Sequence, residues 1–123
     1  MQLRTHVMFQ SGVAAEAGAF YASVVPGGEV VPTSGFGGSV LVRLAGHEVV
    51  LFDSPMPHDF GLTPSTSLFL EVDEAGQVDD VVGRLLEGGH ALMPVGEYDF
   101  AARFGWCVDR FGVSWQVVFR GSE

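Results

Sequence analysis

The two halves of the chain repeat the same order of sequence patterns, and this repeat restricts the folds open to its 123 residues. Each half begins with alternating apolar and polar residues, typical of a half-buried strand, and continues with apolar residues at helical spacing. Short apolar runs separated by glycine follow. The repeat extends to residue identities, because Ala15-Glu16-Ala17-Gly18 resembles Asp73-Glu74-Ala75-Gly76. Repetition at half the chain length predicts two copies of one βαβββ unit.

The first copy is expected at about residues 1–60. Its first strand alternates, so Val7 and Phe9 should share one face, with His6 and Met8 on the other. A glycine-rich stretch, 35–38, should form a tight hairpin turn. The expected elements are a strand at 3–10, a helix at 13–25 and strands at 29–31, 39–44 and 48–52.

The second copy is expected at about residues 65–123. Its first strand should place Leu68 and Leu70 on an apolar face, with Ser67 and Phe69 on the other. Asp73 is the expected helix N-cap. Residues 98–103 are expected to be irregular, either a mobile flap or a packed loop. The expected elements are a strand at 65–72, a helix that ends at about residue 87, and strands at 91–93, 105–108 and 114–119.

Two such units side by side predict a single α+β domain, 1–123. The eight strands would form a curved mixed sheet, with both helices on its outer face and a cleft on its inner face. Residues that alternate away from the helices, such as His6 and Ser67, would then line the cleft.

The amino-acid composition restricts the classes of molecule that the protein can bind. The net charge is −9, with six arginines and no lysine, which excludes the basic clusters that bind nucleic acid. No apolar run is long enough to span a membrane. The N-terminus lacks the apolar core of a signal peptide and Cys107 is the single cysteine, so we expect a cytoplasmic protein. A positive mean hydropathy, +0.30, predicts apolar surface buried in a homodimer.

Several motifs together cover nearly the whole chain. They are His6-Val7-Met8-Phe9-Gln10, Asp53-Ser54-Pro55, His58-Asp59-Phe60, Thr63-Pro64-Ser65-Thr66-Ser67, Leu92-Met93-Pro94 and the closing Phe104-Gly105-Trp106 with Asp109-Arg110-Phe111-Gly112-Val113-Ser114-Trp115-Gln116. With them the chain resembles the vicinal oxygen chelate superfamily of glyoxalase I, bleomycin-resistance proteins and extradiol dioxygenases. The resemblance is to its PhnB-like branch, also described as "3-demethylubiquinone 3-methyltransferase-like". The chain lacks a glycine-rich loop of the type that holds S-adenosylmethionine.

The resemblance implies where a metal would bind. The superfamily's first ligand, a histidine in the opening strand, matches His6. The equivalent position in the second copy falls on Ser67, which is not a histidine. The last ligand, a glutamate seven residues after the aspartate of the closing turn, falls on Gln116. One ligand position remains in the first copy, and Asp53 is the residue near it whose side chain could bind a metal. Such sites take Zn, Mn, Fe or Ni.

Serine and glutamine lack the charge that offsets dehydration of a divalent ion. The leading hypothesis is therefore a protein of undefined activity that binds a small molecule in the cleft without a tightly bound metal. The expected lining residues are His6, Met8, Asp53, Ser67, Phe69, Trp106 and Gln116. One alternative is a metal-dependent lyase, isomerase or dioxygenase that uses His6, Gln116 and Asp53. Another is a non-catalytic dimer that acts through a protein partner.

Other reactive or aromatic side chains have more ordinary expected roles. Trp115 should pack in the core, whereas Trp106 either packs or stacks against a planar ligand in the cleft. Cys107 should be buried and inert. His58 lies in a proline-rich loop, where pairing with Asp59 as a general base would require unusual geometry for adjacent residues.

Overall fold

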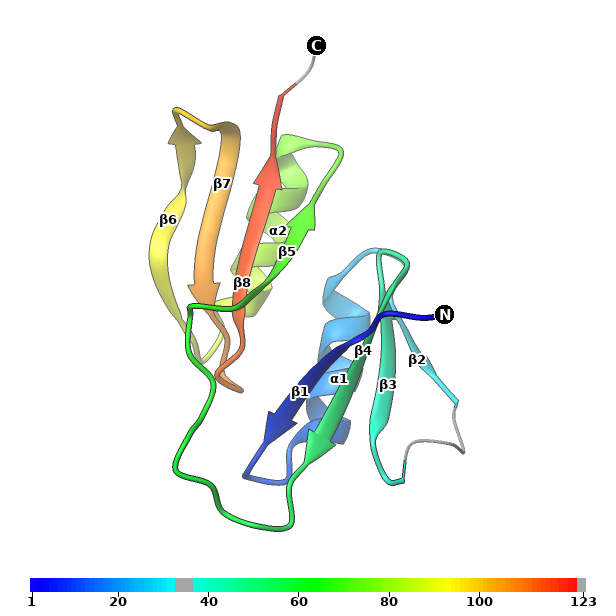
Figure 1. Cartoon of the computed structure of the whole chain (residues 1–123). Helices are drawn as coiled ribbons and strands as arrows, with labels where there is room; N and C mark the ends of the chain where they lie inside the picture. Colours follow the sequence, from blue (N-terminus) through cyan, green and yellow to red (C-terminus); the bar gives the residue numbers. More distant parts are fainter. Residues whose placement is uncertain (33–36, 122–123) are drawn as a thin grey trace. The chain divides into compact units, whose positions relative to one another are not determined.

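The computed structural model describes residues 1–32 and 37–121, and these form two compact units that divide after Gly61 (Figure 1). We call them module one and module two. Each contains one helix and one four-stranded mixed sheet in the order βαβββ. The prediction of an α+β fold built from two βαβββ modules is confirmed. No helix in the described ranges is long and apolar enough to cross a membrane.

Module one has the strand order β1-β4-β3-β2. β1 runs parallel to β4, and the other neighbours are antiparallel. The glycine-rich turn expected between β2 and β3 lies partly outside the described residues, at positions 35 and 36. The elements are β1 (Thr5–Phe9), α1 (Ala14–Val24), β2 (Glu29–Val31), β3 (Val40–Leu44) and β4 (His47–Asp53).

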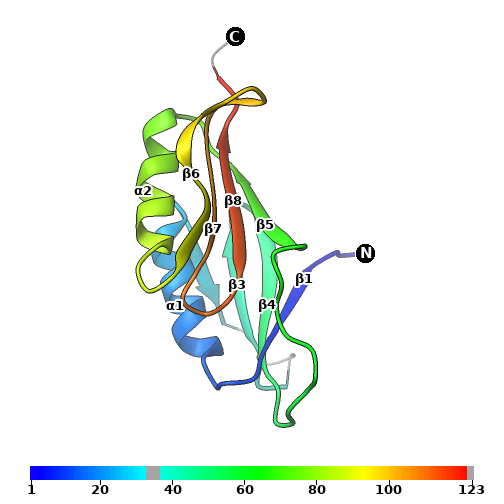
Figure 2. The same ribbon diagram turned by 90° about the vertical axis from the view of Figure 1, so that its left-hand side faces the viewer.

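Module two repeats this arrangement with the strand order β5-β8-β7-β6, in which β5 runs parallel to β8. Figure 2 shows this sheet nearly edge-on, with α2 covering one of its faces. The elements are β5 (Ser67–Glu71), α2 (Ala75–Leu85), β6 (His90–Tyr98), β7 (Ala101–Val108) and β8 (Ser114–Phe119).

Each sheet has a helix face, which packs against the helix of its own module, and an opposite face, which we call the open face. Alternation assigns side chains to the two faces. In β1, Val7 and Phe9 are buried on the helix face, while His6 is exposed. In β8, Trp115 and Val117 are fully buried on the helix face. The predicted core role of Trp115 is thus confirmed.

The start of α2 differs from the prediction. Asp73 is not the N-cap; Glu74 is, and the helix begins at Ala75. Gln77 stands three residues after Glu74, and its side-chain oxygen accepts a hydrogen bond from the Glu74 backbone N–H at 3.0 Å. The Glu74 side chain accepts one from the Gln77 backbone in return. This reciprocal capping box fixes the start one residue later than expected.

The segment expected to be irregular, 98–103, is instead a tight hairpin between two long strands. β6 extends from His90 to Tyr98, and β7 begins at Ala101. The pattern of β6 was hidden because its pairing with β7 shifts register three times. Pro94, which lacks a backbone N–H, is tolerated because β6 is an edge strand.

Candidate functional site

The open face of module two brings together polar side chains from three strands. Ser67 of β5 pairs in register with Ser114 of β8. Trp106 of β7 pairs with Gln116 of β8, two residues beyond Ser114. Residues in register share a face, so all four side chains lie on the open face. Three of them were predicted from the sequence. Ser114 was not, although its two-residue spacing from Gln116 places both side chains on the same face of β8.

These four residues form a continuous hydrogen-bonded group, which we call the serine network. The Trp106 indole Nε1–H donates to Ser114 Oγ at 2.9 Å. The two hydroxyl oxygens, Ser114 Oγ and Ser67 Oγ, lie 2.7 Å apart. The Gln116 side-chain amide donates to Ser67 Oγ at 3.3 Å. Ser114 is buried, whereas Ser67 and Gln116 are half-buried, so the network leads from the interior of the sheet toward its surface.

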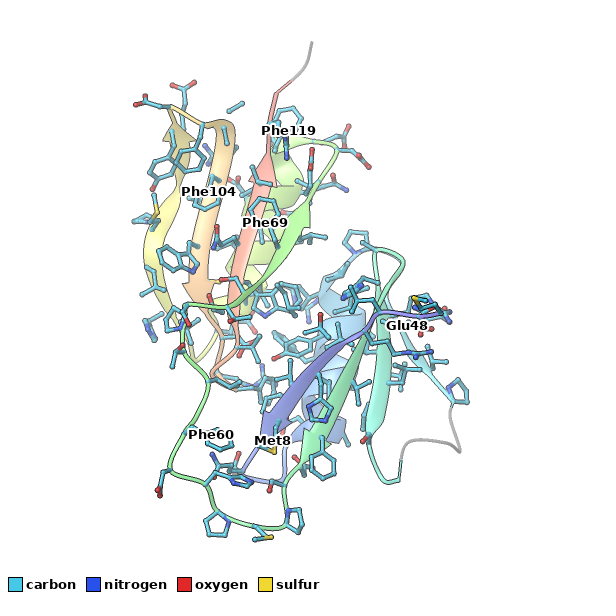
Figure 3. The ribbon with its side chains drawn as sticks, viewed as in Figure 1. Met8, Glu48, Phe60, Phe69, Phe104 and Phe119 are labelled. Carbon is cyan, nitrogen blue, oxygen red and sulfur yellow. The ribbon has the colours of Figure 1, made fainter. Side chains whose placement is uncertain are left out.

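Apolar side chains adjoin the serine network on the same face. Phe69 is in register with Gln116 and is 58% exposed, a high value for so large an apolar side chain. Figure 3 shows Phe69 and Phe104 on the face of the sheet turned away from α2. A small cluster of buried residues extends this apolar area along the sheet: Ala101, Phe104 and Val118, with Met93, Tyr98 and Trp106 packed against it.

His6 and Met8 lie on the open face of module one. His6 is exposed, and its ring centroid is 5.8 Å from that of Phe52. Met8 is in register with Phe52 and is half-buried. The structure thus brings His6 and Met8 together on one sheet, and Ser67, Phe69, Trp106 and Gln116 together on another.

Asp53 has a different place from the one expected. It is in register with Phe9, so it lies on the helix face of module one, opposite His6. Its two carboxylate oxygens are 3.0 and 3.3 Å from the backbone nitrogen of Ala14, the first residue of α1. A carboxylate there accepts a hydrogen bond from an otherwise unpaired N–H and interacts favourably with the helix dipole. Asp53 therefore caps α1 and does not share a face with His6.

The serine network does not fit a transition metal. Its groups are two hydroxyls, an amide and an indole, all neutral, whereas such ions prefer imidazole, thiolate or carboxylate ligands. The Gln116 amide nitrogen and both serine oxygens are also already engaged in hydrogen bonds with one another. Across residues 1–32 and 37–121, no three His, Cys, Asp or Glu side chains are grouped so as to hold a metal ion.

Asp109 determines how β8 enters the sheet. It is only 3% exposed, and its Oδ1 accepts hydrogen bonds from the backbone N–H groups of Phe111 and Val113 at 2.9 and 3.0 Å. Its Oδ2 accepts the indole N–H of Trp115 at 2.9 Å. The aspartate of the closing motif is thus a structural residue. It holds the turn between β7 and β8, and with it the orientation that places Ser114 and Gln116 on the open face.

His58 lies in a loop that side-chain hydrogen bonds hold in place. Its Nε2 lies 2.9 Å from Ser54 Oγ, and its ring stacks on Phe60 with centroids 4.8 Å apart. Gln10 ties the loop to the end of β1, because its side chain accepts from the His58 backbone N–H and donates to the Phe60 carbonyl. These contacts place Ser54, and not Asp59, beside the imidazole.

The hairpin tip between β6 and β7 carries a shallow cavity of about 340 Å³. The rings of Tyr98 and Phe100 stack there with centroids 5.6 Å apart, and the Tyr98 hydroxyl donates to the Pro94 carbonyl at 2.6 Å. The cavity is lined by Glu97, Tyr98, Asp99, Phe100, Ala101, Ala102 and Arg120. None of these residues belongs to the serine network.

Cys107 is fully buried on the helix face, as predicted. Burial, with a smaller contribution from the charge of Asp109, raises the pKa of the thiol from 9.0 to about 11. At pH 8 we therefore expect iodoacetamide to alkylate native protein at least about 100-fold more slowly than urea-unfolded protein, since the thiolate is the reactive form. Mass spectrometry of timed samples measures both rates. Equal rates would show that Cys107 is accessible.

Comparisons with known proteins agree with this architecture. A family model described as 3-demethylubiquinone-9 3-methyltransferase matches residues 1–118. The solved structure of a PhnB protein from Bacillus cereus is 33% identical, with a TM-score of 0.87 over 97% of this chain and 99% of that one. A protein from Pseudomonas aeruginosa is 23% identical, with a TM-score of 0.85 over 99% of both chains.

More distant structures share the fold. The fosfomycin resistance protein FosX from Listeria monocytogenes is 11% identical, with a TM-score of 0.68 over 99% of this chain and 91% of that one. A search of curated proteins found no significant match. The chain belongs to the PhnB-like family described as 3-demethylubiquinone-9 3-methyltransferase.

Proposed function

We propose that the protein binds a small planar organic molecule on the open face of module two, without a tightly bound metal. The observation that carries the proposal is the exposed Phe69 side chain beside the serine network. An aromatic ring that is 58% exposed gains free energy when a ligand covers it. Neighbouring hydrogen-bonding groups would fix the orientation of that ligand, as is usual in small-molecule sites.

The register of the strands determines which shape of ligand would fit this face. Phe69, Gln116 and Trp106 form one row across β5, β8 and β7. Adjacent strands are about 4.8 Å apart, so the outer two residues of the row flank Gln116 at a separation of about 10 Å. A planar ring over Gln116 would contact both aromatic side chains at once.

The proposal covers binding and not turnover. Hydroxyl, amide and indole groups do not titrate near neutral pH, so the serine network offers no general acid or base of matched pKa. Its role is recognition. The methyl transfer named in the family description is not part of this proposal.

A series of naphthalene derivatives tests the binding. We expect at least one of 2-naphthol, 2-acetylnaphthalene, 2-naphthoate and 2-(aminomethyl)naphthalene to bind with a Kd below about 1 mM, as measured by ligand-observed NMR. Phe69→Ala should weaken binding at least about tenfold, because the stacking surface is removed. Phe100→Ala is the matched control, because Phe100 is similarly exposed, at 61%, but lies at the hairpin tip; its effect should stay within about twofold.

Removal of metal gives a further test. Excess EDTA should leave the affinity unchanged, and a loss of binding that Zn or Mn restores would contradict the metal-free proposal. If no compound in the series binds wild-type protein, the proposal is wrong and a role through a protein partner is favoured.

A further inference from the structure

We infer that the ligand of this face carries a carbonyl group on its planar ring, and that Ser67 donates a hydrogen bond to the carbonyl oxygen. The inference deepens the proposed function and rests on it. It follows from the direction of the hydrogen bonds in the serine network, which determines what the network can still offer to a ligand.

The first step is the direction of the bond between the two serines. Ser114 Oγ accepts the indole hydrogen of Trp106. Ser114 is only 2% exposed, and in the described part of the chain the acceptor near its own hydroxyl hydrogen is Ser67 Oγ, 2.7 Å away. If Ser67 donated instead, the Ser114 hydrogen would be buried without a partner, at a cost of about 1–3 kcal/mol. The favoured direction is therefore from Trp106 to Ser114 and from Ser114 to Ser67.

The second step is the state of Ser67. Its oxygen accepts from Ser114 and from the Gln116 amide, which uses both lone pairs. Its own hydrogen is then free to point out of the half-buried network toward a ligand. The outer end of the network therefore presents a hydrogen-bond donor, the Ser67 hydroxyl.

The third step is charge. Because the outer end of the network is a hydrogen-bond donor, the ligand must supply an acceptor. The network holds no cation that would neutralise an anionic acceptor. Glu71 follows Phe69 on the same face of β5, where it pairs with Arg120 at 3.1 Å, and the whole chain carries a net charge of −9. Because Arg120 offsets the charge of Glu71, it is the net charge of the chain that disfavours a carboxylate or phosphate ligand. A neutral ring-bound carbonyl meets both conditions.

A matched pair of probes tests the inference. 2-Acetylnaphthalene and 2-isopropenylnaphthalene have nearly the same shape, and only the first has an acceptor oxygen. We expect wild-type protein to bind the ketone at least about tenfold more tightly than the hydrocarbon, the usual effect of one hydrogen bond from a partly buried donor. Ser67→Ala should reduce this preference to within about twofold. Ser65→Ala, a change of the same size at an exposed serine, should retain it.

NMR gives a second readout, measured on the wild-type protein. A ligand that accepts from Ser67 polarises the chain of bonds back to the indole of Trp106. We expect the ketone to shift the Trp106 indole proton more than the hydrocarbon does. The Trp115 indole, which is bonded to Asp109 on the other side of the sheet, should not move. Trp106→Phe assigns the two signals.

The outcomes separate the inference from the proposed function. If both probes bind wild-type protein equally, the inference fails and the proposed function stands. If 2-naphthoate binds more tightly than the ketone, the neutral carbonyl class is wrong. If neither probe nor any other naphthalene derivative binds, the proposed function itself fails. Gln116→Glu supplies a variant independent of Ser67→Ala: its carboxylate would accept the Ser67 hydrogen and should also abolish the preference, and retention of the preference would contradict the assignment.

Discussion

Gly89→Ala is expected to lower the free energy of unfolding by about 3 kcal/mol or more. Gly89 lies between α2 and β6, where the chain passes over the end of β7. A Cβ atom there would stand 2.2 Å from the Val108 carbonyl oxygen, and 3.0 Å from both Asp109 Cα and the Leu85 carbonyl oxygen. All three are backbone atoms, so no side-chain rotation relieves the overlap. The backbone of the turn or of β7 has to move.

Urea unfolding followed by circular dichroism measures the effect, with Gly83→Ala as the matched control. Gly83 lies inside α2 and is exposed, and apart from its chain neighbours and the helix's own backbone no atom lies within 4 Å of an added Cβ. Alanine there should stabilise the protein by about 0.5–1 kcal/mol, because it reduces the freedom of the unfolded chain and favours the helix. The two methyl groups should thus shift the urea midpoint in opposite directions. A Gly89→Ala midpoint equal to that of wild type would show that the turn adapts.

Asp109→Asn is expected to cost about 3 kcal/mol, the second large effect. The carboxylate accepts three hydrogen bonds at a buried position, two from backbone N–H groups and one from the Trp115 indole. An amide has one oxygen and one NH₂ group, so at least one of the three donors would face another donor. The unpaired group would keep its full desolvation cost because water cannot reach it.

Urea unfolding followed by tryptophan fluorescence tests this substitution, since Trp115 reports directly on the lost bond. Asp59→Asn makes the same chemical change at an exposed residue and should alter stability by less than about 0.5 kcal/mol. An Asp109→Asn protein within that margin of wild type would mean that the three bonds to the carboxylate contribute little net stability.

The open face of module two could be predicted because polar and apolar residues alternate in β5 and at the start of β8. Leu68 and Leu70 alternate with Ser67 and Phe69, so period-two spacing alone separates the two faces. The closing motif placed Gln116 opposite Trp115 in the same way. Here local sequence and tertiary structure agree, because the helix face of these strands is apolar throughout, while Ser67, Ser114 and Gln116 mark the opposite face.

The place of Asp53 could not be predicted, for a physical reason. β4 is a central strand in which Val49, Val50 and Leu51 are all buried, so its apolar residues do not alternate and the pattern does not identify the faces. The sequence therefore does not determine which face of the sheet an acidic residue after such a run occupies. Its partner, the Ala14 N–H, lies 39 residues away and belongs to a helix start that has no side-chain cap of its own.

The length of β6 was missed for a related reason. Irregular pairing with β7 breaks the two-residue period, and Pro94 suggests a loop when read alone. Only the neighbouring strand makes an extended conformation favourable there. Ser114 was overlooked in another way: its importance depends on Ser67, which is 47 residues earlier in the chain.

The parallel pairs β1–β4 and β5–β8 have a consequence for how each module assembles. Every other pair in these sheets joins strands that are neighbours in sequence, whereas the parallel pairs connect the first and last strands of a module. Closing so long a loop costs more conformational entropy than forming a hairpin, and that cost precedes any gain from the contacts. β1 and β5, which carry His6 and Ser67, are therefore the strands whose pairing costs the most conformational entropy in each sheet. We expect each open face to be complete only at the end of folding.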